Sequence, residues 1–282
     1  MKKLLLVDGS NLLFQMFFGM PARIINAQGK AIQGTLGFVG ALLKIIRMVE
    51  PTHVAVLFDG ESQNPRTNLD AEYKANREDY SQVPEEENPF SQLSDIYAAL
   101  DFLGLCHAET TDCETDDWMA GYVKKYGMED TTEIIISSFD SDFFQLISEK
   151  VTILRYRGEN SVYCTPAYLQ EKLGIAPERY ADFKSLTGDF ADNIKGAEKI
   201  GPKTAARLVN TYGTLEEIIV HAEEIKQPSI RESIVRNAER LRKNYQLICL
   251  KGVDKFPFEW DAMAYQDSGI TTTKVLQEIG LK

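Results

Sequence analysis

Short apolar runs alternate with longer amphipathic stretches through about residue 155 of the chain. Three of the apolar runs have the length of buried strands: Leu4 to Val7, Val54 to Phe58 and Ile134 to Phe139. Apolar residues at helical spacing predict helices at three further places: Thr35 to Val49, Phe90 to Phe102 and Thr115 to Tyr126. Strands that alternate with helices favour βαβ units, so the expected fold class is α/β with a parallel sheet.

The pattern changes in the second half of the chain. Val151 to Arg155 and Ser161 to Cys164 predict a small hairpin joined around Gly158. From Pro166 onward short helices broken by glycine replace the strands, which indicates a second, helical unit with its boundary near residues 165–180. Residues after about 250 show weak periodicity and indicate no particular chemistry.

A long polar segment from Gly60 to Pro89 interrupts the alternation. It contains three prolines and the acidic run Glu85 to Glu87, and it offers little that could enter a core. We therefore expect an excursion over the surface that is partly helical around Leu69 to Arg77. Long polar excursions in compact domains are usually functional or disordered.

The composition is that of a soluble globular protein, with 282 residues of which 44% are hydrophobic and 26% charged. The apolar run near the N-terminus ends at Asp8, too early for an export signal, and no stretch approaches the roughly 20 apolar residues of a membrane span. The four cysteines have no paired spacing, which indicates reduced thiols: Cys106, Cys113, Cys164 and Cys249. We expect a cytoplasmic protein without membrane contact.

Nine acidic residues in the first 192 positions occur where one pocket could collect them. Three of them directly follow predicted strands, and the carboxyl ends of parallel strands line one crevice in an open α/β sheet. Two unit charges about 4 Å apart repel by roughly 4 kcal/mol at an effective dielectric of about 20, so such a crevice requires cations. The sequence therefore predicts a site for hard divalent ions, Mg²⁺ or Mn²⁺, at these residues: Asp8, Asp59, Glu114, Asp116, Asp117, Asp140, Asp142, Asp189 and Asp192.

Each acidic motif also has a purely structural interpretation. Glu114 and Asp117 share a face at a helix start, where carboxylates compensate the helix dipole. Asp140 could cap a helix over Phe143 to Ile147, and Asp8 could belong to a plain strand-end turn. Individually these interpretations are strong, but the positions at matching strand ends together favour a metal site.

The formal net charge of −11 argues against nucleic acid as a partner, because phosphate binding usually requires a basic surface. Much of the negative charge lies in the clustered acids, and bound divalent ions would offset it locally. A DNA-binding face would then be local and not spread over the molecule.

The stretch from Gly188 to Ala205 carries a second signal. Two glycines flank a predicted tight hairpin, and Pro202 suits the first turn of the helix that follows. Backbone N–H groups at such a helix start, with Lys203 and Thr204 beside them, would form an anion site suited to a DNA phosphate. A plain loop between two helices is the alternative.

Together these motifs resemble the 5′-nuclease family, which contains flap endonucleases and the 5′→3′ exonuclease domains of bacterial family A DNA polymerases. The resemblance covers about residues 3–245. It is carried by the following motifs: Val7-Asp8-Gly9-Ser10, Phe58-Asp59, Tyr73-Lys74-Ala75-Asn76-Arg77, Glu114-Thr115-Asp116-Asp117, Asp140-Ser141-Asp142 and Gly188 to Ala205. It implies a PIN-like (Rossmann-like), mostly parallel sheet flanked by helices, followed by a helix-three-turn-helix DNA-binding module.

The resemblance further implies an organisation and an activity. The nuclease core would span residues 1–175 with a helical arch or clamp at about 60–96, the DNA-binding module 176–250 and a C-terminal extension 251–282. The activity would be that of a structure-specific 5′ nuclease, a 5′→3′ exonuclease or flap endonuclease that hydrolyses phosphodiester bonds of DNA with two divalent ions. Its partners would be DNA with a 5′ flap, overhang or free 5′ end, and RNA–DNA primer junctions. We expect a monomer in a bacterial-type cytosol.

Carried over position by position, the resemblance assigns one metal ion to Asp8, Asp59, Glu114 and Asp116. It assigns a second ion, directly or through water, to Asp117, Asp140, Asp142, Asp189 and Asp192. Lys74 and Arg77, three residues apart on one face of the arch helix, would be catalytic by stabilising charge on the scissile phosphate. Solvated surface cations are the alternative for this pair.

The resemblance also assigns DNA contacts. Tyr73 would stack on a base near the cut, although a packing role for its ring is equally compatible with the sequence. The hairpin and the helix after it would contact DNA through Gly196, Lys199, Gly201, Lys203 and Thr204. A potassium ion would be bound by the backbone near Asn193, Ala197 and Ile200.

The chain departs from the family pattern at three positions. Relatives commonly carry arginine where Gln15 stands, so a phosphate contact would be absent. Lys195 replaces a proline and Lys199 replaces a glycine. A lysine at position 199 would be strained if the backbone there needs a positive φ, although its charge could add attraction for phosphate.

Two other functions remain open at this point. A PIN-type ribonuclease would share the acid cluster but would not need the hairpin that ends at Ala205. A non-catalytic DNA-junction-binding protein would need neither the full acid set nor the pair Lys74 and Arg77.

Overall fold

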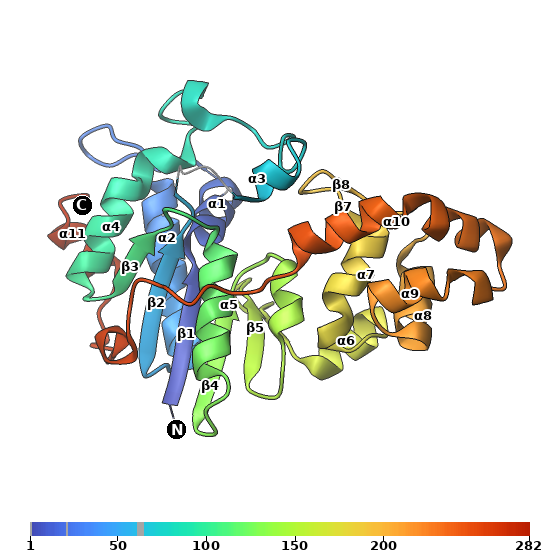
Figure 1. The fold of residues 1–282 in the computed structure, drawn as a ribbon. Coiled ribbons are helices and arrows are strands. Elements are labelled where there is room, and N and C mark those ends of the chain that lie inside the picture. Colours follow the sequence, from blue (N-terminus) through green and yellow to red (C-terminus); the bar gives the residue numbers. More distant parts are fainter. Residues whose placement is uncertain (1, 21, 61–64) are drawn as a thin grey trace.

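The computed structural model describes residues 2–20, 22–60 and 65–282 and is built around a six-stranded sheet in the order β3-β2-β1-β4-β5-β6 (Figure 1). The strands are β1 Lys2–Asp8, β2 His53–Phe58, β3 Cys106–Glu109, β4 Thr132–Ser137, β5 Val151–Arg155 and β6 Val162–Cys164. Strands β1 to β5 pair in parallel, and β6 runs antiparallel to β5. The mostly parallel α/β sheet and the β5–β6 hairpin are confirmed, whereas the short strand β3 was not predicted.

Helices cover both faces of this sheet because side chains of a strand alternate between its faces. On one face, Leu5 and Val7 of β1 pack in a cluster with helices α1 Gly9–Gly19, α2 Gln33–Val49 and α4 Leu93–Phe102. On the other face, Leu4 and Leu6 pack with helix α5 Thr115–Tyr126. The central strand is therefore buried on both sides, as its uninterrupted apolar sequence indicates.

A helical unit follows the sheet. Its helices are α6 Pro166–Leu173, α7 Tyr180–Thr187, α8 Pro202–Tyr212, α9 Leu215–Val220 and α10 Pro228–Ile248. Short 3₁₀ helices complete the described chain at Tyr80–Gln82, Pro89–Gln92, Asp142–Leu146, Pro177–Arg179, Ala222–Glu224 and Trp260–Met263. The hydrophobic cluster on the α5 face of the sheet continues into this unit through Phe143, Tyr180 and Leu208, so the sheet and the helical unit share one core.

A two-stranded hairpin, β7 Gly188–Asp189 and β8 Ile194–Lys195, joins α7 to the loop before α8. Gly188 has φ of 78°, and a Cβ there would lie 2.4 Å from the backbone nitrogen of Gly196. A Cβ on Gly196 would in turn lie 2.3 Å from the carbonyl carbon of Thr187. Only glycine permits this close approach, which fixes the hairpin against the end of α7.

The polar segment after β2 lies above the carboxyl ends of the strands (Figure 1). It contains helix α3 Pro65–Leu69, and residues 71–76 then form turns with Lys74 at φ 57°. The expectation that the helix continues from Leu69 to Arg77 is therefore wrong, because a residue in the left-handed region cannot continue a right-handed helix. Residues 61–64 lie outside the described part of the chain.

Residues 251–282 fold back over the sheet as a strap, which we define as this range. The chain runs from α10 across α5 and ends in helix α11 Thr272–Glu278 beside α2 and α4 (Figure 1). Its backbone is held at two places: Val253 N–H donates to the Asp117 carbonyl at 3.3 Å, and Tyr265 N–H donates to the Thr52 carbonyl at 2.9 Å. The weak sequence periodicity of this range therefore concealed an ordered, packed segment.

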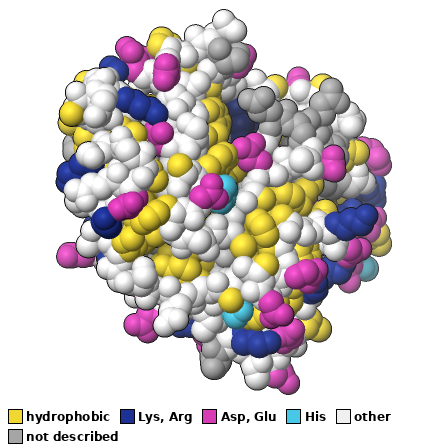
Figure 2. Space-filling view, turned by 90° about the vertical axis from the view of Figure 1, so that its left-hand side faces the viewer, with side chains coloured by type: hydrophobic (Ala, Val, Ile, Leu, Met, Phe, Trp, Pro, Cys, Tyr) yellow, Lys and Arg dark blue, Asp and Glu magenta, His cyan; other side chains and the backbone are white. Residues whose placement is uncertain are grey.

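The charged surface differs between faces. On the face that carries α4 and α11, acidic side chains are spread among hydrophobic ones, and lysine and arginine side chains stand in small separate groups (Figure 2). This face therefore lacks the continuous basic surface that binding of a polyanion requires, in keeping with the net charge of −11. In the part of the chain that the structure describes, no helix combines the length and apolar character needed to cross a bilayer.

The contact between the strap and α5 can be tested at Gly121. A Cβ there would lie 2.4 Å from the Val253 carbonyl oxygen, so we expect Gly121→Ala to lower the free energy of unfolding by about 1–3 kcal/mol. Gly40 of α2 is the matched control, because its Cβ would have its nearest neighbour at 3.7 Å. Gly40→Ala should be neutral or stabilise by up to about 1 kcal/mol. Urea denaturation measures both, and equal effects of the two substitutions would contradict the tight contact.

Candidate active site

Three neighbouring parallel strands end at the same edge of the sheet and bring their acidic residues together. In the register of β1 with its neighbours, Asp8 lies opposite Leu57 of β2 and Val7 lies opposite Ser137 of β4. Asp59 and Asp140 follow these strand ends by one and three residues. The side chains predicted to meet therefore do so because of parallel pairing in this order.

A pocket of about 830 Å³ lies at this edge. It is lined by five of the predicted acids together with the two predicted catalytic cations: Asp8, Asp59, Glu114, Asp116, Asp140, Lys74 and Arg77. The aromatic residues Phe14, Tyr80 and Phe90 form part of the wall and contact one another edge to face. The pocket thus combines a charged floor with an apolar side.

Asp8 serves both the local fold and the pocket. Its Oδ1 accepts a hydrogen bond from the Asn11 N–H at 3.0 Å and caps α1, and its Oδ2 accepts one from the Ser138 hydroxyl at 2.8 Å. Burial, and secondly the Asp59 carboxylate, raises the pKa of Asp8 to about 7. Asp8 is therefore both the N-cap of α1 and part of the pocket lining, and its role as a metal ligand stays a prediction.

Asp140 and Asp142 form the next part of the cluster. The Asp142 N–H donates to Asp140 Oδ1 at 2.8 Å, which is a tight local turn and not a helix cap, since Ser141 precedes the 3₁₀ helix Asp142–Leu146. Burial raises the pKa of Asp140, and it raises that of Asp142 to about 7 although the Lys184 ammonium acts in the opposite direction. Both carboxylates are thus held where negative charge is unfavourable without a cation.

Asp142, Asp189 and Asp192 form a compact acid trio. One carboxylate oxygen of each lies within 4.8 Å of the others, and Asp142 and Asp192 are buried. This trio joins the sheet edge to the β7–β8 hairpin, which carries Asp189 and leads to Asp192. Oxygen-only donors of this kind suit a hard divalent cation, so the residues fit the ion that the sequence predicts.

Arg66 was not predicted as a site residue. Its guanidinium is buried and contacts three of the predicted acids: Glu114, Asp116 at 2.9 Å and Asp117 at 2.9 Å. Burial opposes its charge, but Asp116 and the other anions outweigh burial and raise its pKa. Its only sequence signal is a basic residue in a mostly polar segment, which does not say which acids it will contact.

Lys184 was also missed. It is buried in α7 and contacts Asp142 and Asp189, the latter at 2.6 Å. Burial opposes the ammonium, yet Asp142 and the neighbouring groups raise its pKa. A usable signal existed, because a lysine between Phe183 and Leu186 on a buried helix requires an anionic partner.

Lys74 and Arg77 reach the acids from the segment after α3. The Lys74 ammonium contacts Glu114, and Arg77 Nη2 donates to Asp192 Oδ1 at 2.8 Å. They come from consecutive turns and not from one helical face, which corrects the sequence-based placement. Burial, with Arg77 as the second cause, lowers the pKa of Lys74. The Lys74 side chain is 19% exposed, whereas that of Arg77 is 54% exposed and pairs with a buried acid from the surface.

Tyr73 adopts the packing role that the sequence left open. Its side chain is 5% exposed and packs with Ala181, Ile194 and Leu247, and its hydroxyl donates to Glu114 Oε2 at 3.2 Å. Buried in this way, the ring offers no free face to a base. The stacking interpretation of Tyr73 is therefore not supported by its position.

The predicted DNA-contacting residues other than Tyr73 lie between the end of the β7–β8 hairpin and the first turn of α8. Gly201 is the N-cap of α8, Lys203 and Thr204 lie in its first turn, and Gly196 ends the hairpin. Lys199 is exposed and has φ of 65°. The expected strain at this lysine is thus present, because the left-handed region favours glycine.

The residues predicted to hold potassium occupy the same loop. Ile200 N–H donates to the Ala197 carbonyl at 3.2 Å, and Ala197 N–H donates to the Leu186 carbonyl at 2.9 Å. Asn193 has φ of 58° and its side chain donates to the Glu72 carbonyl at 2.8 Å. The Asn193 side chain therefore contacts the segment after α3, and the potassium site, which would use backbone groups, stays a prediction.

Gln15 has a structural partner. Its Nε2 donates to the Tyr156 carbonyl at 2.7 Å and ties α1 to the end of β5. The residue that stands in place of the family arginine therefore stabilises the fold and does not point freely toward a ligand.

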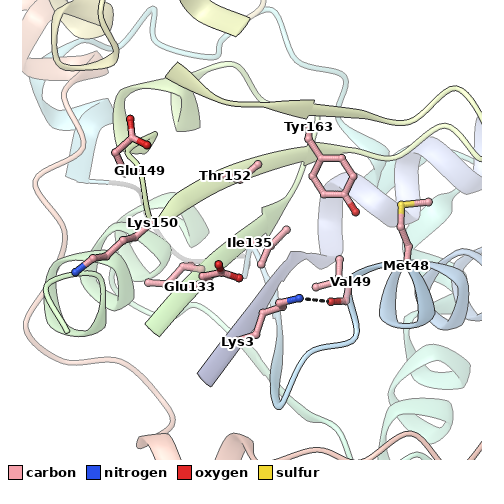
Figure 3. Close-up of a pocket in the computed structure, with 10 residues that line it drawn as sticks. Lys3, Met48, Val49, Glu133, Ile135, Glu149, Lys150, Thr152 and Tyr163 are labelled. Atoms are coloured by element: carbon pink, nitrogen blue, oxygen red, sulfur yellow. Dashed lines mark hydrogen bonds between the residues drawn. The ribbon is translucent and has the colours of Figure 1, made fainter. Parts of the chain in front are cut away.

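A second hollow, of about 310 Å³, lies at the opposite edge of the sheet (Figure 3). Lys3, Glu133 and Thr152 line it from the amino ends of three strands, and Lys3 Nζ donates to the Val49 carbonyl at 2.9 Å. The residues that line it carry both positive and negative charges, and they form no compact group of acids. None of the predicted site residues lines it.

The chain matches two family models that together span most of its length. Residues 3–174 match the 5′-3′ exonuclease, N-terminal resolvase-like domain, and residues 175–270 match the 5′-3′ exonuclease, C-terminal SAM fold. The chain therefore belongs to the 5′-3′ exonuclease family, a family of nucleases, which confirms the resemblance found in the sequence.

Curated relatives give the closer comparison. DNA polymerase I, thermostable, of Thermus thermophilus is 36% identical over 245 residues, which are 87% of this chain and 28% of that protein. DNA polymerase I of Streptococcus pneumoniae R6 is 34% identical over 244 residues, 85% of this chain and 27% of that protein. The chain thus spans less than a third of the length of these relatives.

Solved structures share the fold at lower identity. The bacteriophage T5 D15 flap endonuclease, in a complex with DNA and metal ions, has a TM-score of 0.71 at 24% identity and covers 99% of this chain and 98% of its own. The catalytic core of Rad2 with DNA substrate has a TM-score of 0.60 at 16% identity, covering 100% and 92%. These likenesses confirm the sheet and the helical unit as one known architecture.

The raised pKa of Asp8 leads to a stability prediction for metal-free protein. Its folded pKa of about 7 exceeds the ordinary value of 3.8, so the folded state binds more protons in that window and loses stability as pH rises through it. Asp8→Asn should therefore stabilise the metal-free protein at pH 8 by about 2–4 kcal/mol, and by progressively less toward pH 4. An amide keeps the contact with Asn11.

Urea denaturation in EDTA at several pH values measures this difference. Added Mg²⁺ should stabilise the wild type at pH 8 and should stabilise Asp8→Asn less, because one ligand is changed. A gap between the two proteins that does not shrink on acidification would contradict the pKa assignment.

The strain at Lys199 leads to a second prediction. Lys199→Gly should raise the free energy of unfolding by about 0.5–1 kcal/mol, because relief of the left-handed strain exceeds the entropy gained by the unfolded chain. Thermal unfolding should shift upward by about 1–3 °C. Lys203→Gly in α8 removes the same charge from a helical residue and should destabilise by up to about 1 kcal/mol. A loss of stability in both variants would refute strain at position 199.

Proposed function

We propose that this chain is a structure-specific 5′ nuclease that hydrolyses phosphodiester bonds of branched or 5′-ended DNA. One observation carries the proposal: five acids from four separate motifs and the cations Lys74 and Arg77 line a single pocket, in a chain that belongs to the 5′-3′ exonuclease family. The relatives that the chain matches are more than three times as long, so the proposed activity is that of this chain alone and not that of the whole relatives.

The acid cluster fits divalent ions, and we propose Mg²⁺ or Mn²⁺ at two positions. Asp8, Asp59, Glu114 and Asp116 would hold one ion, and the remaining acids Asp117, Asp140, Asp142, Asp189 and Asp192 the other. When bound, such ions supply a nucleophilic water and stabilise the leaving oxygen. Raised pKa values at Asp8 and Asp142 support the requirement for added positive charge. We also propose potassium near Asn193, Ala197 and Ile200.

Lys74 and Arg77 would hold the phosphate at the pocket. Each now contacts an acid of the cluster, Glu114 and Asp192 respectively. Divalent ions on these acids would compete with both contacts and release the two cations toward a substrate phosphate. A charge-assisted hydrogen bond from either would then stabilise charge that develops on the phosphate oxygens.

The proposed substrate is DNA with a 5′ flap, overhang or free 5′ end, including RNA–DNA primer junctions. The loop before α8, with Gly196, Lys199, Gly201, Lys203 and Thr204, would contact the backbone of the duplex. The proposed organisation is a nuclease core to residue 175 with an arch at about 60–96, a DNA-binding module at 176–250 and an extension at 251–282. We also propose a monomer that acts in a bacterial-type cytoplasm.

The experiment is single-turnover cleavage of a 5′-flap DNA with Mg²⁺, next to a matched RNA. We expect wild type to cut the flap, and Asp116→Asn and Asp140→Asn to reduce the rate by at least about a thousandfold while flap binding persists, because each removes one ligand charge. Asp101→Asn, on the exposed end of α4, is the control carboxylate and should cut normally.

Each alternative function has its own outcome. Wild type that binds the flap and cuts neither substrate would establish a non-catalytic junction-binding protein. Cleavage of RNA alone would establish a PIN-type ribonuclease. Normal cleavage by Asp116→Asn and Asp140→Asn would remove the acid cluster from the mechanism.

A further inference from the structure

Phe190 stands out on the surface of the candidate site. Its side chain is 93% exposed, and it lies in the turn between Asp189 and Asp192. Burial of a phenylalanine side chain is worth roughly 1.5–3 kcal/mol, so full exposure leaves that stabilisation unused. Among the described residues, Met128 at 83% is the next most exposed large hydrophobic side chain, and it lies at the far end of α5.

The backbone under this ring is firmly held. The Phe190 carbonyl accepts hydrogen bonds from the Asn193 N–H at 3.2 Å and from Asn76 Nδ2 at 3.1 Å. On one side the Ala191 N–H donates to Asp189 Oδ1 at 2.9 Å, and on the other the Lys74 N–H donates to the Asp192 carbonyl at 3.1 Å. The ring is thus presented on a fixed turn, and its exposure does not come from a loose loop.

The charged groups around Phe190 indicate which kind of molecule would contact its ring. The flanking carboxylates belong to the acid trio, whose third member, Asp142, lies within 4.8 Å of both. Beyond them come Arg77 on Asp192 and Lys184 on Asp189. A phosphodiester held at this cluster would therefore place its neighbouring nucleobases near the turn that carries the ring.

A nucleobase also fits better than a protein surface. A stable protein interface buries about 800 Å² per partner around an apolar centre, whereas the neighbours of Phe190 in the turn are two carboxylates, an alanine and an asparagine. A stack with a base needs only one open face of the ring and tolerates every sequence, because each base has a π face.

We propose that Phe190 stacks on a nucleobase next to the phosphate at the acid cluster and so positions the strand for cleavage. The proposal rests on the proposed nuclease function and adds to it a residue of the stretch from Gly188 to Ala205 to which the resemblance assigns no role. Phe190 takes the role that the buried Tyr73 cannot fill. It is a positioning residue, since the chemistry remains with the acids and with Lys74 and Arg77.

The stack also has a consequence for the substrate. A base inside a duplex has both faces covered by its neighbours and therefore cannot also lie on Phe190. The ring therefore favours 5′ ends whose base at the cluster is unpaired, as in a flap or a frayed end.

The test uses 5′-flap DNA with 2-aminopurine in turn at the nucleotides on either side of the cleavage position. Complexes are formed with Mg²⁺ in the Asp140→Asn background, which holds the DNA uncut. We expect a drop in fluorescence at one of these nucleotides, loss of that drop in Phe190→Ala, and its retention in Phe190→Tyr. In single-turnover cleavage without the Asp140 change, Phe190→Ala should be slower by about tenfold, within the contribution of one aromatic–base stack.

Two further variants separate stacking from a structural role. Phe190→Leu keeps an apolar side chain without a π face and should behave like Phe190→Ala. Phe102→Ala removes another exposed phenylalanine, 42% exposed at the end of α4, and should leave fluorescence and rate unchanged. The Phe190 variants should unfold at the wild-type temperature, because the Phe190 side chain is 93% exposed and adds little to the core.

The outcomes distinguish failure of base stacking by Phe190 from failure of the proposed nuclease function. If wild type cuts the flap while Phe190→Ala, or Phe190→Leu alone, keeps both the fluorescence drop and the full rate, stacking is refuted and the nuclease function stands. If wild type neither binds nor cuts the flap, the nuclease function fails and the stacking proposal fails with it.

Discussion

Repulsion among carboxylates at one edge of the sheet is the constraint around which this molecule is arranged. Parallel pairing of β1, β2 and β4 forces the acids together, and burial raises the pKa of several of them. Buried cations from elsewhere in the chain reduce the cost: Arg66 on the α5 acids and Lys184 on the acid trio. The acids that make the site costly thus hold helix α3, through Arg66, and helix α7, through Lys184, at the site.

The sheet could be predicted because its signals are local. Apolar runs of strand length, and helices with one apolar face, identify themselves within a few residues, and the parallel order then follows from the alternation. The helix expected around Tyr73 failed for a different reason. Lys74 takes a left-handed conformation so that its backbone can reach Asp192, which is a contact across more than a hundred residues. The strap was missed because its support comes from α5 and α2.

The site shows the same division between local and distant causes. The acids could be predicted because they follow strand ends or stand in short motifs. The cations that contact them could not be predicted. Which acids Arg66 contacts, or whether Tyr73 or Phe190 keeps a free ring, depends on how the β7–β8 hairpin meets the segment after α3. The family pattern helped at Lys199, where an expected glycine foretold the observed positive φ. At Tyr73 the sequence left base stacking and packing open, and the structure shows a buried ring that packs with Ala181, Ile194 and Leu247.

The strap that crosses α5 limits how far the sheet and the helical unit can move relative to each other. Since it leaves the helical unit after α10 and is anchored on the far side of the sheet, it closes the molecule into a ring of contacts in addition to the shared core. A hinge between sheet and helical unit would have to stretch this tether. The distance between the α8 helix start and the acids is accordingly set by the fold. A strand bound at that helix start would therefore meet the acids at a constant distance along its length.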